Sequence, residues 1–344
     1  MVFIVITLIK IAVIAFILLT VLAYLQWVER KVIAHVQVRM GPYRVGPHGL
    51  LQPLADVIKL ITKEGVMPPH VNSFFYLLAP FLAVFMALIS ISVIPFGTQL
   101  TVGPYTTWMQ LTDVNVGILF ILAISSLGVY GVALAGWSSN NKYSLLGGLR
   151  SSAQMISYEL PMSLAIASPL LLAGTLSLRE IVNSQAGYNF GFLPKWAIFA
   201  GPFPQIFSFI IFMIAAFAET NRIPFDLPEA ENELVAGFHV EYSSMTFASF
   251  FMAEYANMVT VACLASVLFL GGWTGPVFGP PLLQSLLPVL WFAVRVFVFM
   301  FIYIWVRGTL PRFRYDQLMA FGWKFLLPLA IANIVVTALV VALK

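Results

Sequence analysis

Eight long apolar runs alternate with more polar connections along the chain of 344 residues. The runs cover residues 3–27, 74–95, 115–136, 155–175, 196–218, 245–271, 286–306 and 322–343. Each run is long enough to cross the hydrocarbon layer, where only helices and closed barrels satisfy the backbone hydrogen bonds. The pattern predicts an all-α polytopic membrane protein of about eight transmembrane helices. We find no internal repeat and expect one domain, residues 1–344, whose first run is a span and not a removable signal peptide.

A shorter periodic segment lies in the first connection, from Leu50 onward. Its apolar positions share one helical face: Leu50, Leu54, Val57, Ile58 and Ile61. The segment is too short and too charged to span a bilayer, so it predicts an interfacial amphipathic helix in the first cytoplasmic loop. Such a helix is either a plain surface anchor or one side of an opening toward the lipid.

Lys and Arg gather in the connections after the first, third, fifth and seventh runs, and only Arg179 and Lys195 lie in the connections on the opposite side. Connections rich in Lys and Arg stay in the cytoplasm. The asymmetry predicts a multi-pass protein of the cell inner membrane, or of an equivalent energy-converting membrane. Both termini are expected on the outer, periplasmic side.

The composition argues against nucleic-acid binding and against a redox centre in this chain. The chain is 60% hydrophobic and 9% charged, and its net charge of +4 is small, so nucleic acid is not implied. The single cysteine, Cys263, cannot hold an iron–sulfur cluster, and the four histidines lie outside the centres of the apolar runs. The sequence therefore predicts no metal site, no covalently bound cofactor and no redox centre in this chain.

Residues 218–255 depart from the apolar pattern, because they hold half of the 14 acidic residues. These are Glu219, Asp226, Glu229, Glu231, Glu233, Glu241 and Glu254. Carboxylates at a bilayer boundary either stay hydrated or become hard to ionise, and a row of coupled carboxyls is what a proton path needs. The alternative is a hydrated acidic loop that keeps two spans soluble, although it explains Glu219 and Glu254 poorly.

Two further charges lie in apolar surroundings. Glu159 precedes Pro161 near the predicted inner end of the fourth run, where a proline loosens the helix and admits water or side chains. Arg295 lies inside the seventh run and needs a carboxylate, a water cavity or a bound polar group. A structural ion pair with a carboxylate of this chain would also explain Arg295.

Two long motifs carry a family likeness: WVERKVIAHVQVRMGPYRVGPHGLLQPLADVIKLITKE and AETNRIPFDLPEAENELVAGFHVEYSS. With the number and spacing of the runs, they make the whole chain resemble the H-type membrane subunit of proton-pumping NADH:quinone oxidoreductase, respiratory complex I. One departure is His239, where a small polar residue such as Asn is expected. The resemblance implies a subunit that forms the membrane-side part and entrance of the quinone chamber and couples quinone reduction to proton translocation.

The resemblance also implies roles for single residues. The proton-coupling carboxylates would be Glu159, Glu219, Asp226, Glu229, Glu231, Glu233 and Glu254. The quinone chamber and its entrance would involve Glu29, Arg30, Arg39, Phe225 and Arg295. Quinone would be the substrate, while NADH, FMN and iron–sulfur clusters would belong to partner subunits. The partners would be other membrane subunits and the quinone-site and iron–sulfur subunits of the peripheral arm.

Other functions compete with this one. A secondary transporter is less consistent with the sequence, because transporters often show two related halves and this chain shows none. A structural anchor for a soluble partner needs no carboxylates inside spans. Related complexes have similar subunits. The equivalent subunit of a membrane-bound hydrogenase or of a ferredoxin- or deazaflavin-linked complex is therefore an alternative, because the acidic stretch does not distinguish between these complexes.

Overall fold

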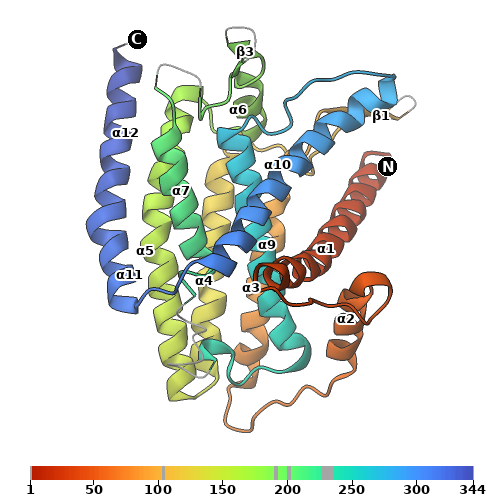
Figure 1. The fold of residues 1–344 in the computed structure, drawn as a ribbon, viewed down its shortest axis with the longest axis vertical. Coiled ribbons are helices and arrows are strands. Elements are labelled where there is room, and N and C mark those ends of the chain that lie inside the picture. Colours follow the sequence, from red (N-terminus) through yellow and green to blue (C-terminus); the bar gives the residue numbers. More distant parts are fainter. Residues whose placement is uncertain (1, 103–104, 190–192, 200–202, 227–235, 344) are drawn as a thin grey trace.

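The computed structural model describes residues 2–102, 105–189, 193–199, 203–226 and 236–343, which are mainly helical (Figure 1). The helices are α1 Val2–Val36, α2 Gln52–Thr62, α3 Ser73–Ile91, α4 Gly117–Ser138, α5 Lys142–Ala173, α6 Leu178–Ser184, α7 Ile206–Glu219, α9 Ser244–Phe269, α10 Pro281–Thr309, α11 Tyr315–Phe321 and α12 Leu327–Ala342. A π-helical segment, Gly322–Leu326, joins α11 to α12. Two antiparallel hairpins pair β1 Gln99–Val102 with β2 Tyr105–Trp108, and β3 Tyr188–Asn189 with β4 Leu193–Pro194.

Within the described residues, seven helices are long and apolar enough to cross a membrane, which confirms the all-α polytopic class. The fifth predicted run forms α7, whose 14 residues span about 21 Å. α1 begins and α12 ends in the upper half of Figure 1, whereas α2 lies in the lower half, and we call that lower end of the bundle the α2 end. Chain ends on the same side imply an even number of passages, and α7 would supply the eighth. The count of eight membrane crossings stays a prediction.

Three of the helices that differ in extent from the predicted runs bear on the site. α1 continues to Val36, so Glu29 lies on a helix and not in a loop. α5 starts at Lys142, because the Asn141 side chain caps it by accepting a bond from the Tyr143 amide (2.9 Å). Glu159 therefore lies well inside α5 and not near its end, which corrects the sequence-based placement. α7 starts ten residues later than predicted, after Pro204, because proline disfavours helical conformation in the residue before it.

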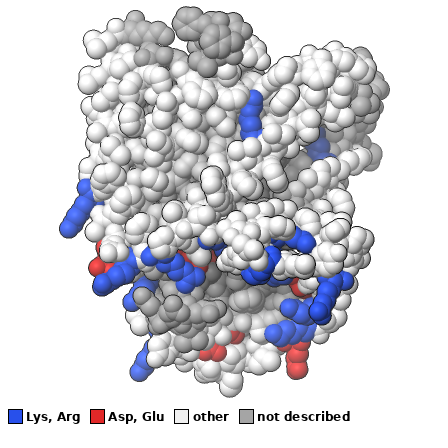
Figure 2. All heavy atoms as spheres, viewed as in Figure 1, with Lys and Arg blue, Asp and Glu red and all other residues white. Residues whose placement is uncertain are grey.

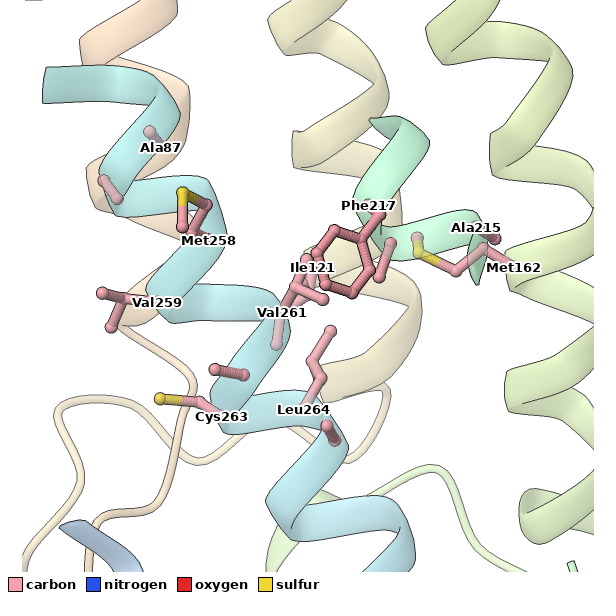
Figure 3. Packing of buried hydrophobic residues seen from close by; sticks show 14 of the residues in the cluster. Ala87, Ile121, Met162, Ala215, Phe217, Met258, Val259, Val261, Cys263 and Leu264 are labelled. Atoms are coloured by element: carbon pink, nitrogen blue, oxygen red, sulfur yellow. The ribbon is translucent and has the colours of Figure 1, made fainter. Parts of the chain in front are cut away.

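α9 forms the centre of the bundle. Its side chains are buried on almost every face, as expected for a helix that is apolar all round and surrounded by others. Figure 3 shows Val261 and Leu264 of α9 close to Ile121 of α4 and Phe217 of α7. α1, in contrast, is inclined to the bundle and exposes most of its apolar side chains.

Charge and the amphipathic helix gather at the α2 end. On the face drawn in Figure 2, the Lys, Arg, Asp and Glu side chains lie mostly in the lower part, which is the α2 end. Arg30 of α1 holds α2 through an ion pair with Asp56, at 2.9 Å. The apolar face of α2 stays exposed, with Leu54, Ile58 and Ile61 each more than half accessible. This arrangement confirms the predicted amphipathic helix.

Candidate functional site

The chain turns sharply at the α2 end of α7, where the acidic stretch begins. The helix ends in a Schellman motif: the Asn221 amide donates to the Ala218 carbonyl oxygen (3.3 Å), and the Arg222 amide donates to the Phe217 carbonyl oxygen (3.2 Å). Asn221 adopts the left-handed conformation, with φ of 49°, which Asn tolerates better than most residues. The motif fixes where the Arg222 side chain starts.

A buried glutamine of α5 holds this turn in place. Gln154 Nε2 donates hydrogen bonds toward three oxygen atoms. These are the Ala218 carbonyl oxygen at 2.9 Å, Asn221 Oδ1 at 3.1 Å and the Phe225 carbonyl oxygen at 2.8 Å. Asn221 Nδ2 in turn donates to Ser151 Oγ at 3.1 Å. A buried side-chain amide without hydrogen-bond partners would lower the stability of the fold. These bonds therefore hold α5 and the turn in a fixed position relative to each other.

A cavity of about 640 Å³ opens beside the turn. The end of α1, the segment after it, the turn, α9 and the end of α10 all contribute to its wall. Its charged and hydrogen-bonding side chains are Gln26, Glu29, Arg30, Gln37, Arg39, Asn221, Arg222, Asp226, Tyr255 and Arg307. Ile33, Met40 and Phe251 add apolar surface. Pockets of 300–1,000 Å³ with a few fixed polar groups are typical of small-molecule sites.

Glu29 is the anchor of this large cavity. Its carboxylate is 4% exposed and forms an ion pair with Arg307 of α10. The Tyr255 hydroxyl donates to Glu29 Oε2 at 2.7 Å, and Arg222 Nη1 lies 3.9 Å from Glu29 Oε1. A buried carboxylate with two cations and a hydroxyl donor is stable in its ionised form. The group can fix the polar end of a bound molecule.

A second cavity, of about 30 Å³, lies between α3, α4, α5, α7 and α9. Glu219 and Glu254 are its two carboxyl side chains, and Asn221 lines both cavities. The volume is enough for one or two water molecules, since one water needs roughly 10–15 Å³. Polar neighbours for such water include Ser125 and Asn257.

Comparison with known proteins assigns the chain to a family. The model of the family described as NADH dehydrogenase matches residues 9–338. The chain belongs to the NADH dehydrogenase family. It is 61% identical to an H-type subunit of NADH-quinone oxidoreductase from Solibacter usitatus, over 99% of this chain and 98% of the relative. It is 64% identical to an H-type subunit of the same enzyme from Koribacter versatilis, over the same two shares. The resemblance to the H-type membrane subunit is thereby confirmed.

Of the nine family-based site residues that the structure describes, six line the two cavities. Glu29, Arg30, Arg39 and Asp226 line the large cavity. Glu219 and Glu254 line the small one. Asp226, assigned to proton coupling, lies in the large cavity and pairs with Arg312 at 3.1 Å. The remaining coupling candidates of the loop, Glu229, Glu231 and Glu233, lie outside the described residues.

Glu219 and Glu159 form a pair of neighbouring carboxyls in this member of the NADH dehydrogenase family. Glu219 is partly buried, and Glu159 is close enough for their charges to repel. Glu219 Oε2 has no hydrogen-bond partner among the described side chains. The ion pairs found for Arg222 join it to Glu29 and Glu254.

Phe225 and Arg295 lie apart from the large cavity. The Phe225 ring stacks on Phe313, with centroids 5.5 Å apart, and tilts against Tyr158 at 5.7 Å. Its side chain therefore packs behind the wall of the cavity.

Arg295, in α10, reaches the connection after α9 and not the α2 end. Its guanidinium donates to the carbonyl oxygens of Gly272 and Thr274 and lies 4.7 Å from the centre of the Trp196 ring. Carbonyl groups and an aromatic face thus provide the polar partners that an arginine in this run needs. The role of Arg295 in quinone binding stays a prediction.

Sequence reasoning missed four residues that build the site: Gln154, Arg222, Tyr255 and Arg307. Arg222 had a visible signal, because it is the only basic residue between 218 and 255. Arg307 belongs to the basic connection after the seventh run, whereas Gln154 and Tyr255 carry no charge that would mark them. Among the described residues, no group of three or more His, Cys, Asp or Glu side chains is placed to hold a metal ion.

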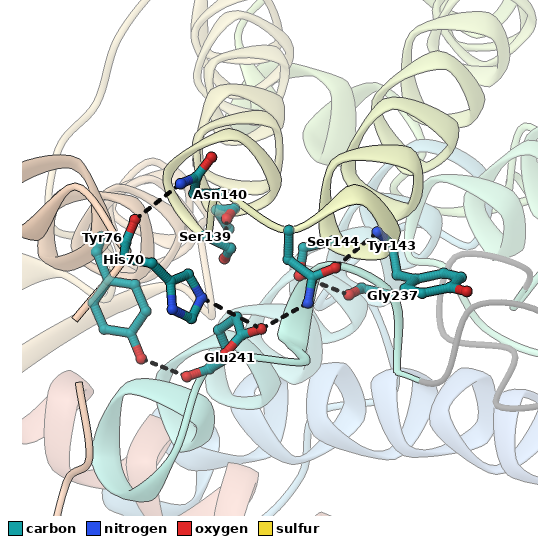
Figure 4. Close-up of polar contacts among 10 residues, drawn as sticks. His70, Tyr76, Ser139, Asn140, Tyr143, Ser144, Gly237 and Glu241 are labelled. Atoms are coloured by element: carbon teal, nitrogen blue, oxygen red, sulfur yellow. Dashed lines mark hydrogen bonds and ion pairs between the residues drawn. The ribbon is translucent and has the colours of Figure 1, made fainter. Parts of the chain in front are cut away.

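Glu241, the carboxylate of the acidic stretch that lies shortly before α9, belongs to a separate polar network (Figure 4). Its Oε1 accepts from Asn141 Nδ2 at 2.7 Å and lies 3.9 Å from His70 Nε2, while its main-chain oxygen accepts from the Tyr76 hydroxyl at 2.8 Å. Tyr76 stacks on Tyr242, with centroids 4.2 Å apart, and burial raises the pKa of the Tyr242 hydroxyl. The network ties together three segments at the α2 end.

His239, the departure from the family motif, is buried among aromatic rings. Phe238, Phe247, Phe250 and Phe251 surround its imidazole, with ring centroids 3.8–5.7 Å away. Burial lowers the pKa of His239 to about 3, so the side chain is neutral. Because Phe238 and Phe250 also line the small cavity, His239 supports the wall of that cavity from behind.

Proposed function

We propose that the chain is the membrane subunit of an NADH:quinone oxidoreductase that forms the membrane-side part and entrance of the quinone chamber and couples quinone reduction to proton translocation. It is a single membrane domain of the cell inner membrane, with both termini on the outer side. Other membrane subunits and the quinone-site and iron–sulfur subunits of the peripheral arm are its partners. NADH, FMN and the iron–sulfur clusters reside in those partners.

The observation that carries this proposal is the adjacency of the two cavities across Asn221. The large cavity offers a polar end around Glu29 and apolar side chains such as Ile33 and Phe251, which suit a polar headgroup followed by an apolar tail. The small cavity holds carboxyls that water can link. Quinone reduction to quinol takes up electrons and protons in equal number and leaves the quinol neutral, so the groups that supply the protons change their charge beside these carboxyls.

The entrance faces the lipid between α1 and α2. Arg30 joins α1 to Asp56 of α2 and also lines the large cavity, so the amphipathic helix lies next to this cavity. The exposed apolar face of α2 gives an isoprenoid tail a surface on which to approach. The relatives named above are quinone oxidoreductase subunits, which favours quinone over the acceptors of hydrogenase-like complexes.

A photoreactive quinone analogue tests this proposal in the intact complex. We expect label on α1, α2 or α9, and we expect excess quinone to suppress it. Ile33→Trp fills the large cavity and should reduce both labelling and quinone-linked turnover. The matched control, Ile17→Trp, changes an exposed position of the same helix and should leave both unchanged. Label confined to the connections at the opposite end would contradict the proposal.

A further inference from the structure

Arg222 lies where the two cavities meet. Its side chain lines the large cavity, and its Nη2 lies 3.8 Å from Oε2 of Glu254, which lines the small one. The preceding residue, Asn221, lines both cavities and is held by Gln154 and Ser151. The backbone at this point is therefore fixed, while the guanidinium reaches from one cavity toward the other.

The guanidinium is shared between two carboxylates. It lies 3.9 Å from Glu29 and 3.8 Å from Glu254, and both distances exceed the 2.7–2.9 Å of a tight charge-assisted bond. The Tyr255 ring supports it from one side, with Cζ of Arg222 4.2 Å from the ring centre. A small movement would tighten one ion pair and lengthen the other.

The two carboxylates differ in what else holds them. Glu29 is paired with Arg307 and accepts a hydrogen bond from Tyr255, so it keeps its place when Arg222 moves. Glu254 lies on α9 one residue before Tyr255, so one short stretch of helix presents a group to each cavity. Both carboxylates and Arg222 are largely buried, which leaves their attraction little screened by salt.

We propose that Arg222 is a positioning residue that links the charge of Glu29 in the large cavity to Glu254 in the small cavity. When Glu29 is ionised, Arg222 is shared between the two carboxylates. When a reduced and not yet fully protonated quinone adds negative charge beside Glu29, Arg222 moves toward the large cavity and its ion pair with Glu254 lengthens, so the small cavity experiences the event in the large one. This inference rests on the proposed function, because it takes quinone chemistry as the source of the charge change.

Protons translocated per electron, measured in proteoliposomes with the assembled complex, test the link. We expect Arg222→Met to lower this ratio at least two-fold. Glu254→Gln should lower it as well, and the double variant should be no worse than Glu254→Gln alone, because both changes interrupt one connection. Arg222→Lys keeps the charge but not the two-sided reach of the guanidinium, so it should fall between wild type and Arg222→Met.

Arg307→Met is the matched control. Arg307 also pairs with Glu29, but it lines only the large cavity, so this variant should slow turnover and keep the number of protons per electron. If Arg222→Met does not assemble, the Arg222→Lys series decides in the same way.

Losses that add up in the double variant, or an unchanged ratio in Arg222→Met and Arg222→Lys, would overturn the link. Failure of the proposed function looks different, since quinone labelling and turnover would then be insensitive to Ile33→Trp whatever the Arg222 variants do.

Discussion

Two carboxyl groups, the buried Glu29 and the partly buried Glu219, lie on either side of the Asn221 turn in opposite surroundings. Glu29 faces an open cavity and is held by Arg307, Arg222 and the Tyr255 hydroxyl. Glu219 faces a cavity about twenty times smaller, with another carboxyl as its charged neighbour. The surroundings of Glu29 therefore stabilise a negative charge, whereas those of Glu219 disfavour one.

This difference separates two tasks. A carboxylate that stays ionised can anchor a polar headgroup and keep the walls of a chamber together. A carboxyl that is costly to ionise exchanges its proton in response to small changes of charge nearby. We therefore propose that the large cavity serves binding and the small one proton handling, and the variants below test that division.

The largest effect is expected at Glu219. Glu219→Gln removes the exchangeable proton, and Glu219→Lys buries the opposite charge. We expect losses of quinone reduction and pumping on the order of ten-fold for Gln and a hundred-fold for Lys, while the complex assembles. A native gel measures assembly, and turnover is then expressed per assembled complex. Glu180→Gln, at the opposite end, serves as the control, and normal turnover of assembled Glu219→Gln would remove Glu219 from the proton path.

Glu29→Gln should act on stability as well as on turnover. The amide still accepts the Tyr255 bond but leaves two buried guanidinium groups beside an uncharged side chain. We expect the variant to lose about 2 kcal/mol of stability, seen as a lower midpoint in thermal unfolding of the complex. Asp56→Asn, which breaks the more exposed pair with Arg30, should cost less than about 1 kcal/mol. Equal losses would show that Glu29 is no special anchor.

His239 should give a smaller, pH-dependent effect. Its folded pKa of about 3 lies below the value of about 6.5 in an unfolded chain, so at low pH the unfolded state binds a proton that the folded state refuses. Stability should therefore fall as the pH drops from about 6.5 toward 3, and His239 should add no slope above about pH 7. His239→Asn should flatten this slope in thermal unfolding, whereas His35→Asn, at an exposed position, should keep it. An unchanged slope in His239→Asn would contradict the buried neutral imidazole.

No loss of activity is expected from the variants that test orientation. Lys142→Cys and Ala186→Cys, in a Cys263→Ser background, place thiols at exposed positions near opposite ends of the bundle. A membrane-impermeant reagent should label Lys142→Cys from the cytoplasmic side and Ala186→Cys from the outer side. Labelling from the same side would be inconsistent with eight crossings and with an α2 end on the cytoplasmic side.

The sequence by itself determined the class of protein and much of the site. Long apolar runs must be helices in a membrane, because no other open structure satisfies its backbone there, and the amphipathic period of α2 needs no tertiary information. The acidic stretch was visible because carboxyl groups are rare in an apolar chain. The motifs then pointed to the family and, through it, to Glu29, Glu219 and Glu254.

The tertiary structure alone decided how these groups are divided and paired. Glu29 and Glu254 are 225 positions apart, and which cation reaches them depends on the packing of α1, α9 and α10, which no local pattern encodes. The sequence did not reveal the roles of Gln154 and Tyr255 for the same reason, because the role of an uncharged side chain depends on which residues lie next to it. Arg222 stood out in the sequence as a lone cation, but its position between two carboxylates follows from the Schellman turn and the contacts that hold it.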